Sequence, residues 1–167
     1  MATRSLIWLK INSADFGKTL HSDISILPNP IEGEYELNKA VHIPSNPLND
    51  ILYLGIYCHW DGYPDGVGKE LQNKFNTYEK VLNLILLGDC SSIIEEISPY
   101  HIWCGEELIV RRVEGGKPAA TEGYNYIFDG ESWTCNETID SSDLGTVVVR
   151  CLTSNINDWG FFIYEYN

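Results

Sequence analysis

Residues 57–71, YCHWDGYPDGVGKEL, decide how this chain folds. The residues leading into them, 51–60, are nearly all apolar and rich in β-formers, which is typical of a strand covered on both faces. Beyond this strand, apolar side chains recur at the four-residue spacing of a helix, at Val67, Leu71 and Phe75. A buried strand therefore passes through an aromatic, glycine-rich turn directly into a helix, and that turn is where we expect a functional site.

A second helix is predicted immediately after the first. Thr77 is placed to cap it and Gly88 to end it. Its apolar residues form one stripe, at Tyr78, Val81, Leu82, Ile85 and Leu86. Ser92 and Glu95 have the spacing of a capping box and predict one further short turn of helix before Pro99.

The rest of the chain reads as strands and loops. Residues 5–11 predict a first strand buried on both faces, whereas residues 12–50 are polar and proline-rich and predict loops with short edge strands such as 35–43. Strands that alternate or are rich in β-formers follow the helices, at residues 107–113, 124–128, 132–135, 146–153 and 161–166. This order predicts an α+β fold, with a helix pair packed on one face of a mostly antiparallel sheet.

Length and charge limit the possible functions. A chain of 167 residues fits a single domain, 1–167, in which residues 12–50 are an elaboration. Its formal charge of -13 repels nucleic-acid backbone and anionic membranes, so we expect no direct binding to either, and no segment approaches the length of a membrane span. An acidic surface can attract a basic protein surface, although net charge also simply keeps a protein in solution.

The cysteines indicate a reducing compartment. Five are present, an odd number, and none forms a C-x-x-C pair, so neither a disulfide framework nor a zinc ribbon is predicted. The first residues carry no signal-peptide core. We therefore expect free thiols and a cytoplasmic location.

The turn itself offers two chemical readings. His59 and Asp61 are candidate catalytic residues, since a carboxylate near an imidazole can fix its tautomer and raise its basicity. The structural alternative is that Asp61 bonds within the turn and His59 bonds a neighbouring carbonyl, and we favour it. Strand alternation puts Tyr57 and His59 on one face and Cys58 and Trp60 on the other. A Cys58 nucleophile would therefore need a distant base such as His101, and a buried structural thiol is favoured instead.

Metal and nucleotide sites are not predicted here. An EF-hand calcium loop requires an oxygen ligand at its third position. If Asp61 is the first position, Tyr63 occupies the third. Gly66 and Gly68 form a G-x-G at a helix start, but Leu71 stands where a dinucleotide fingerprint has its last glycine. We therefore predict no metal and no cofactor.

The turn also resembles a known family. Thr3-Arg4-Ser5 before a strand, then HWDGYP, then two helices ending in residues 87–92, LGDCSS, resemble small bacteriophage and integrated-element proteins of uncharacterised activity. The family's positions are matched without a gap, at His59, Trp60, Asp61, Gly62, Tyr63, Pro64, Gly68 and Leu71. The resemblance covers the first strand and roughly residues 55–92, departs at 12–50, and fades after Ile93 apart from a tyrosine-rich hairpin. It implies a phage or mobile-element origin and an α+β domain, without an activity.

Two functions remain open from the sequence. The first is a non-enzymatic protein that binds a host or phage protein, with Trp60, Tyr63 and exposed members of the tail 159–166 as aromatic anchors. The second is a small-molecule-binding protein or a hydrolase-like enzyme, with Arg4 as anion clamp, His59 as general base and Asp61 as its orienter. We favour binding over catalysis, because the turn does not supply a complete set of catalytic roles.

Overall fold

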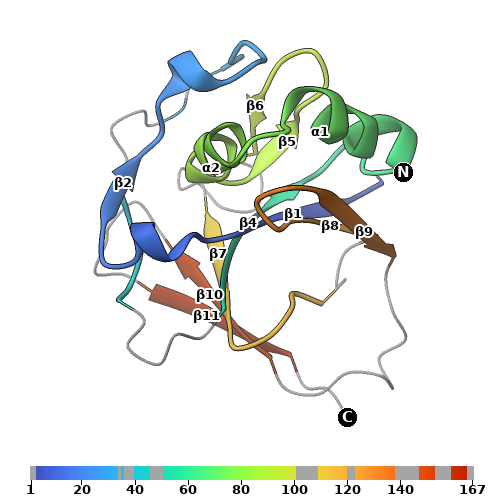
Figure 1. Cartoon of the computed structure of the whole chain (residues 1–167). Helices are drawn as coiled ribbons and strands as arrows, with labels where there is room; N and C mark the ends of the chain where they lie inside the picture. Colours follow the sequence, from blue (N-terminus) through green and yellow to red (C-terminus); the bar gives the residue numbers. More distant parts are fainter. Residues whose placement is uncertain are drawn as a thin grey trace.

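The fold is seen in a computed structural model of the chain (Figure 1). It describes residues 3–33, 35, 40–45, 51–100, 109–119, 123–137, 147–152 and 159–164, and beyond residue 136 it describes backbone only.

In the described residues a nine-stranded sheet forms the framework, with the pairing order β11-β10-β7-β4-β1-β8-β9; β5 pairs with β4, and β6 pairs with β5. Its strands are β1 Ser5–Lys10, β4 Leu52–Cys58, β5 Cys90–Ser92, β6 Ser98–Pro99, β7 Val110–Glu114, β8 Tyr124–Phe128, β9 Trp133–Glu137, β10 Val147–Leu152 and β11 Trp159–Tyr164. Most neighbours are antiparallel, but β1 pairs with β8, and β4 with β5, in parallel. The predicted α+β class is confirmed, with a sheet that is mixed rather than purely antiparallel.

The two central strands explain why their sequences are apolar on both sides. In β1 every residue from Ser5 to Leu9 is buried, and in β4 all seven residues are buried. The two strands pair directly, with Ser5 opposite Cys58 and Lys10 opposite Tyr53. Because each strand has a partner on both edges and side chains packed on both faces, neither alternates between apolar and polar residues.

The helices follow the turn as predicted. A π-helical segment, η3 Pro64–Gly68, leads into α1 Lys69–Lys74, and α2 Tyr78–Leu86 comes next. The Thr77 side chain caps α2 by accepting a hydrogen bond from Lys80 N. Gly88 lies just past its end with a φ of 87°, a conformation that glycine adopts without steric cost.

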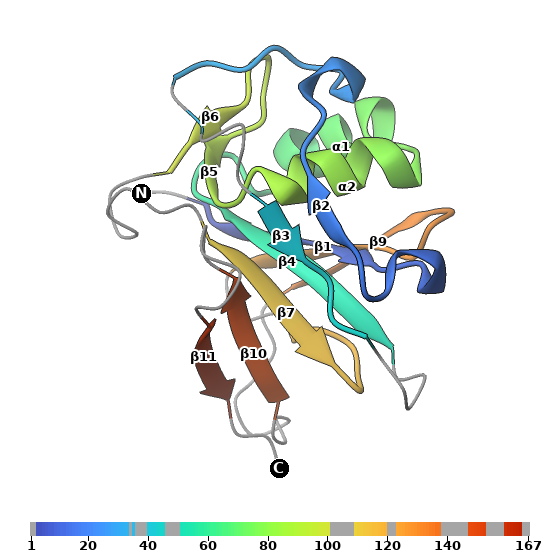
Figure 2. The same ribbon diagram turned by 90° about the vertical axis from the view of Figure 1, so that its left-hand side faces the viewer.

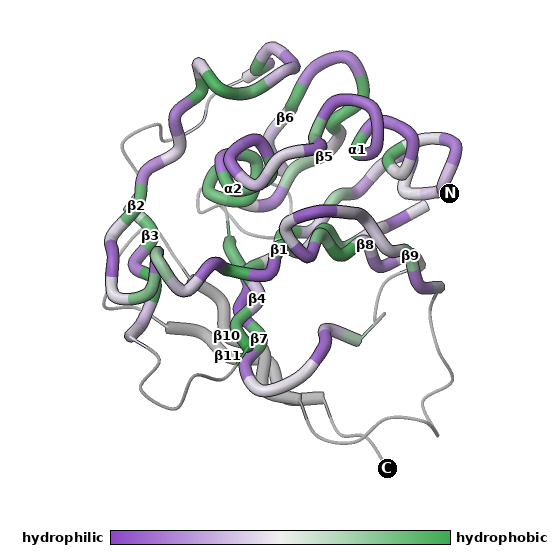
Figure 3. The backbone as a smooth tube through the Cα atoms, viewed as in Figure 1, coloured by the Kyte–Doolittle hydropathy of each residue, from purple (hydrophilic) through white to green (hydrophobic). Residues whose placement is uncertain are grey.

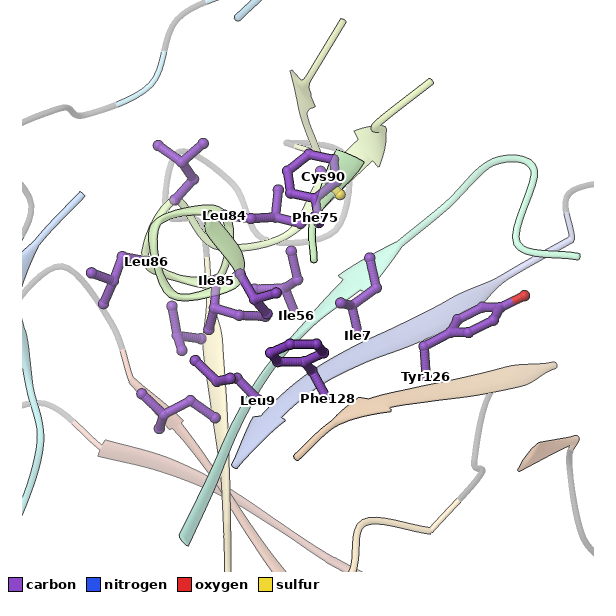
Figure 4. Close-up of a cluster of buried hydrophobic side chains, with 14 of the residues drawn as sticks. Ile7, Leu9, Ile56, Phe75, Leu84, Ile85, Leu86, Cys90, Tyr126 and Phe128 are labelled. Carbon is purple, nitrogen blue, oxygen red and sulfur yellow. The ribbon is translucent and has the colours of Figure 1, made fainter. Parts of the chain in front are cut away.

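Both helices cover one face of the sheet (Figure 1). Figure 4 shows the core between them: Ile7 and Leu9 of β1, Ile56 of β4 and Phe128 of β8 meet Leu84 and Ile85 of α2. All six are at most 1 % exposed. The motif turn therefore leads from the end of the central strand β4 to the helices that cover this face.

The opposite face carries a smaller and more polar core. Its apolar cluster is Leu6, Trp8, Tyr53, Tyr57, Tyr100, Val113 and Ile127. Trp8 Nε1 donates to Asn125 Oδ1 at 2.7 Å, and Asn125 Nδ2 donates to the Pro118 carbonyl at 3.0 Å. These bonds satisfy polar groups that burial would otherwise penalise.

The predicted elaboration forms its own small layer. In the described part of residues 12–50, β2 Thr19–His21 pairs with β3 Ala40–His42, flanked by the short 3-10 helices η1 Ser13–Asp15 and η2 Ile24–Ile26. This ribbon lies beside α2 (Figure 2), and Asn83 of α2 accepts from Asp23 N at 2.6 Å. Figure 3 shows hydrophobic (green) stretches in β2 and β3, and Val41 and Ile43 lie in the helix-side core. The elaboration thus covers α2 rather than extending the main sheet.

The prediction of a helical turn after Ser92 is wrong. Cys90 pairs with Cys58 and with Pro99, which holds residues 90–92 extended. The Ser92 hydroxyl instead accepts from Ile94 N at 3.1 Å, and Glu95 has a φ of 61°. Strand pairing therefore overrides a local capping signal.

No helix among the described residues is both long and apolar enough to cross a membrane.

Candidate functional site

The motif turn begins where β4 ends, at Cys58. His59 N donates to the Cys90 carbonyl at 3.1 Å, and Trp60 N donates to the Ser91 carbonyl at 2.8 Å, so β5 holds the start of the turn. Asp61 then has a φ of 59°, a left-handed conformation that Asp tolerates better than most residues. The chain reverses at this point and enters η3.

Gly62 clamps the turn to the first strand. Its N–H donates to the Thr3 carbonyl at 2.8 Å, and its carbonyl accepts from the Tyr126 hydroxyl at 2.7 Å. A Cβ at this position would lie 2.7 Å from the Arg4 carbonyl oxygen, closer than side chains tolerate. Glycine is therefore required so that two backbones can touch.

The entry into the helices is fixed by backbone hydrogen bonds. The Asp61 carbonyl accepts from Val67 N at 2.7 Å, and the Tyr63 carbonyl accepts from Gly66 N at 2.9 Å. Val67 is fully buried. Backbone hydrogen bonds therefore hold the turn at both ends and in its middle. The side chains that are not part of these contacts project from a rigid backbone.

Two aromatic side chains of the turn face solvent. Trp60 is 48 % exposed and Tyr63 is 42 % exposed. The Tyr63 hydroxyl donates to Asp61 Oδ1 at 3.2 Å, and this bond, with the Asp61 charge, raises the pKa of Tyr63. Neither aromatic side chain is therefore used to fill the core.

His59 lies in a group of stacked rings. Its Nδ1 and the Tyr57 hydroxyl share a hydrogen bond of 2.7 Å, its ring stacks on Tyr100 at 4.9 Å, and its ring meets the edge of Trp60 at 4.6 Å. The shared face of Tyr57 and His59 is confirmed. The prediction that Trp60 points to the opposite face is wrong, because the strand ends at Cys58 and its alternation ends there too.

Two of the three residues predicted for catalysis are neighbours. The register pairs Ser5 with Cys58, so Arg4 and His59 are the next residues outward on the two strands. Burial and the positive charge of Arg4 lower the pKa of His59, which favours the neutral imidazole. Asp61 instead pairs with Tyr63, and the Tyr57 phenol occupies the nitrogen that an orienting carboxylate would need.

An ion pair with a buried carboxylate contacts this group, and no sequence pattern predicted it. Asp89, whose side chain is 1 % exposed, accepts from Tyr57 N at 2.8 Å and pairs with Arg111. The Arg111 guanidinium lies 5.9 Å from the centre of the Tyr57 ring. Asp89 lies between Gly88, which follows α2, and the buried Cys90 of β5. A charged residue in this apolar stretch was the one sign in the sequence that could have indicated a buried ion pair.

Cys58 is a core residue. It is fully buried in the helix-side cluster and lies opposite Cys90 across the parallel pair. Contact with Cys58, together with burial, raises the pKa of Cys90. The favoured interpretation of Cys58 as a buried thiol is confirmed, and His101, its suggested base, lies outside the described residues, as do the side chains of the tail 159–166.

Among the residues that the structure describes, no group of three or more His, Cys, Asp or Glu side chains is arranged to hold a metal ion. Comparisons of the chain with protein-family models, with curated proteins and with solved structures find no significant match.

Proposed function

We propose that this chain is a non-enzymatic binding protein that engages a host or phage protein through its motif turn. One observation carries the proposal: Trp60 and Tyr63 are large, exposed aromatic side chains, three residues apart, on a turn that is fixed by backbone hydrogen bonds. Rigid aromatic anchors of this kind bury much apolar area for little loss of side-chain entropy. The resemblance of the HWDGYP turn to phage and mobile-element proteins supports a partner in the cytoplasm of a bacterial host.

The charges around the anchors favour a basic partner. Asp61 is half-buried and Asp65 exposed, and both carboxylates act on the Tyr63 phenol. The whole chain carries a formal charge of -13. A partner that presents lysine or arginine beside an apolar surface would gain electrostatic attraction on approach and cation–π contact with Trp60.

A second function is favoured by one observation, the closeness of Arg4 and His59. A neutral imidazole beside a guanidinium can bind an anionic small molecule or act as the base of a hydrolase-like enzyme. This alternative needs a group that orients His59, and Asp61 is engaged elsewhere. We therefore place it second.

Affinity capture from a bacterial host lysate, followed by mass spectrometry, tests the proposal. The wild-type protein is compared with Trp60→Ala and with Asp61→Asn, a nearly isosteric change that the left-handed conformation of residue 61 tolerates. Ile24→Ala is the matched control, because Ile24 is 45 % exposed on η2, away from the turn.

We expect one protein to be recovered with wild type and Ile24→Ala and to be lost with Trp60→Ala. Recovery of the same proteins with all folded variants would contradict binding through the turn. If the protein comes out alone in every form, the Arg4 and His59 alternative becomes the leading one and is tested by screening anionic metabolites.

A further inference from the structure

A concave site lies at the other end of β1 from the motif turn. It has a volume of about 400 Å³, within the range of small-molecule pockets. Its walls come from the end of β1, from η1, from the start of β4 and from the turn between β8 and β9, which Figure 2 shows at the same end of the sheet. Since β1 rises about 3.3 Å per residue, this cavity is roughly 20 Å from Gly62 and is separate from the proposed interaction surface.

Part of the cavity lining is apolar. Ile11, Phe16 and Ile51 line it, and Ile51 is 45 % exposed, an apolar area that a ligand would cover. The Tyr78 ring forms another wall. Its hydroxyl donates to Asp15 Oδ2 at 2.6 Å and accepts from Asn12 N at 3.1 Å, so the ring is held in place without a ligand.

Opposite charges line the same cavity. Lys10 ends β1, and Asp129 begins the turn between β8 and β9. Asp129 Oδ1 accepts from Glu131 N at 2.8 Å and from Ser132 N at 2.9 Å, which orients the carboxylate. These bonds, with a smaller contribution from Lys10, lower the pKa of Asp129 and keep it ionised.

We propose that this cavity binds a small zwitterion with an apolar side chain, of the class of free aromatic or branched-chain α-amino acids. Lys10 binds the carboxylate, Asp129 binds the ammonium group, and Phe16 and Ile51 cover the side chain. A ligand with one charge would match one of these residues and leave the other facing an apolar group. A zwitterion matches both, and its apolar side chain covers the exposed surface of Ile51.

A titration of the full-length protein, followed by ¹H–¹⁵N NMR, tests this proposal. L-Phenylalanine is compared with phenethylamine, which lacks the carboxylate, and with 3-phenylpropionate, which lacks the ammonium group. We expect saturable shifts at the amides of Asn12 and Gly130 with L-phenylalanine, and Kd values about tenfold higher for each truncated ligand, because each lacks one charged hydrogen bond. Equal affinities for all three ligands, or no saturable shift at the solubility limit of L-phenylalanine, would overturn it.

Two variants assign the charges. Lys10→Met should raise the Kd of L-phenylalanine by about tenfold and leave the Kd of phenethylamine unchanged. Asp129→Asn should likewise raise the Kd of L-phenylalanine by about tenfold, and it should leave the Kd of 3-phenylpropionate unchanged. Asparagine keeps the Oδ1 acceptor that the turn uses. Lys69→Met and Glu32→Gln, at exposed positions away from the cavity, make the same changes of charge and should bind as wild type. If these controls weaken binding as much as the cavity variants, the effect is one of net charge and the proposed site is wrong.

Discussion

The motif turn has a buried part that contacts neighbouring strands and an exposed part that faces solvent. Gly62 is buried, and its backbone contacts Thr3 and Tyr126, so that it ties the turn to β1 and β8. Trp60 and Tyr63, directly on either side of the Asp61-Gly62 pair, place nearly half of their surfaces in solvent. A short motif can therefore contain both a structural clamp and an exposed surface.

The ion pair that supports the turn should give the largest loss of stability. Asp89→Asn removes the carboxylate that binds Tyr57 N and Arg111 in a site where the side chain is 1 % exposed. We expect the free energy of unfolding to fall by about 3 kcal/mol, since breaking a buried pair leaves one charge poorly compensated. Urea denaturation measures this loss, with the exposed Asp65→Asn as control. A loss below about 1 kcal/mol would mean that the pair does not support the turn.

The glycine clamp should come next. Gly62→Ala places a Cβ 2.7 Å from the Arg4 carbonyl oxygen, and the backbone must shift to accept it. We expect a loss of about 2–3 kcal/mol in urea denaturation. Gly116→Ala is the matched control, because a Cβ at Gly116 has nothing within 4 Å. Similar stabilities for the two variants would contradict the clamp.

Tyr126→Phe should give a smaller effect on the same half of the turn. It removes the hydroxyl that donates to the Gly62 carbonyl at 2.7 Å and leaves the buried ring in place. A loss of about 1–2 kcal/mol is expected, because the buried carbonyl loses a hydrogen bond. Tyr124→Phe, on the same strand with a half-buried ring, should cost less than about 0.5 kcal/mol. Thermal unfolding measures the loss of stability in both variants. An equal or larger loss for Tyr124→Phe than for Tyr126→Phe would contradict the role of the Tyr126 hydroxyl.

The pKa of His59 gives the smallest effect and tests the environment of the exposed half. Burial and Arg4 lower it below its ordinary value of 6.5. Because the folded state then binds a proton less readily than the unfolded state, His59 contributes more stability as pH rises from its folded pKa toward 6.5. NMR titration of the imidazole should give a pKa below 6.5, and Arg4→Gln should raise it partway. A value at or above 6.5 in wild type would contradict this placement of Arg4.

Local patterns predicted most of the elements. The stripe of apolar residues in α2, with Thr77 before it and Gly88 after it, gave the helix and both of its ends. The continuous apolar runs of β1 and β4 gave two central strands. These features depend on neighbours within a few residues, which the sequence displays directly.

Pairings between distant residues could not be predicted in the same way. The parallel contact of β1 with β8 joins Leu6 to Asn125, and the ion pair joins Asp89 to Arg111, 22 residues away. The same limit explains the error at Ser92, where a capping box was present but pairing of Cys90 with Cys58 decided the conformation. Strand alternation placed Tyr57 beside His59, whereas the stacking of Tyr100 on His59 and the Asp89–Arg111 ion pair needed the fold.

The affinity of the captured partner for Trp60→Ala is the direct test of whether the motif turn is a binding surface. Isothermal titration calorimetry is run with purified partner, wild type, Trp60→Ala and Ile24→Ala, after urea denaturation has shown that both variants unfold within about 0.5 kcal/mol of wild type. We expect Trp60→Ala to raise Kd roughly thirtyfold, a loss of about 2 kcal/mol typical of an aromatic anchor, while Ile24→Ala stays within about twofold. Equal affinities for wild type and Trp60→Ala would show that the exposed half of the turn is not a binding surface.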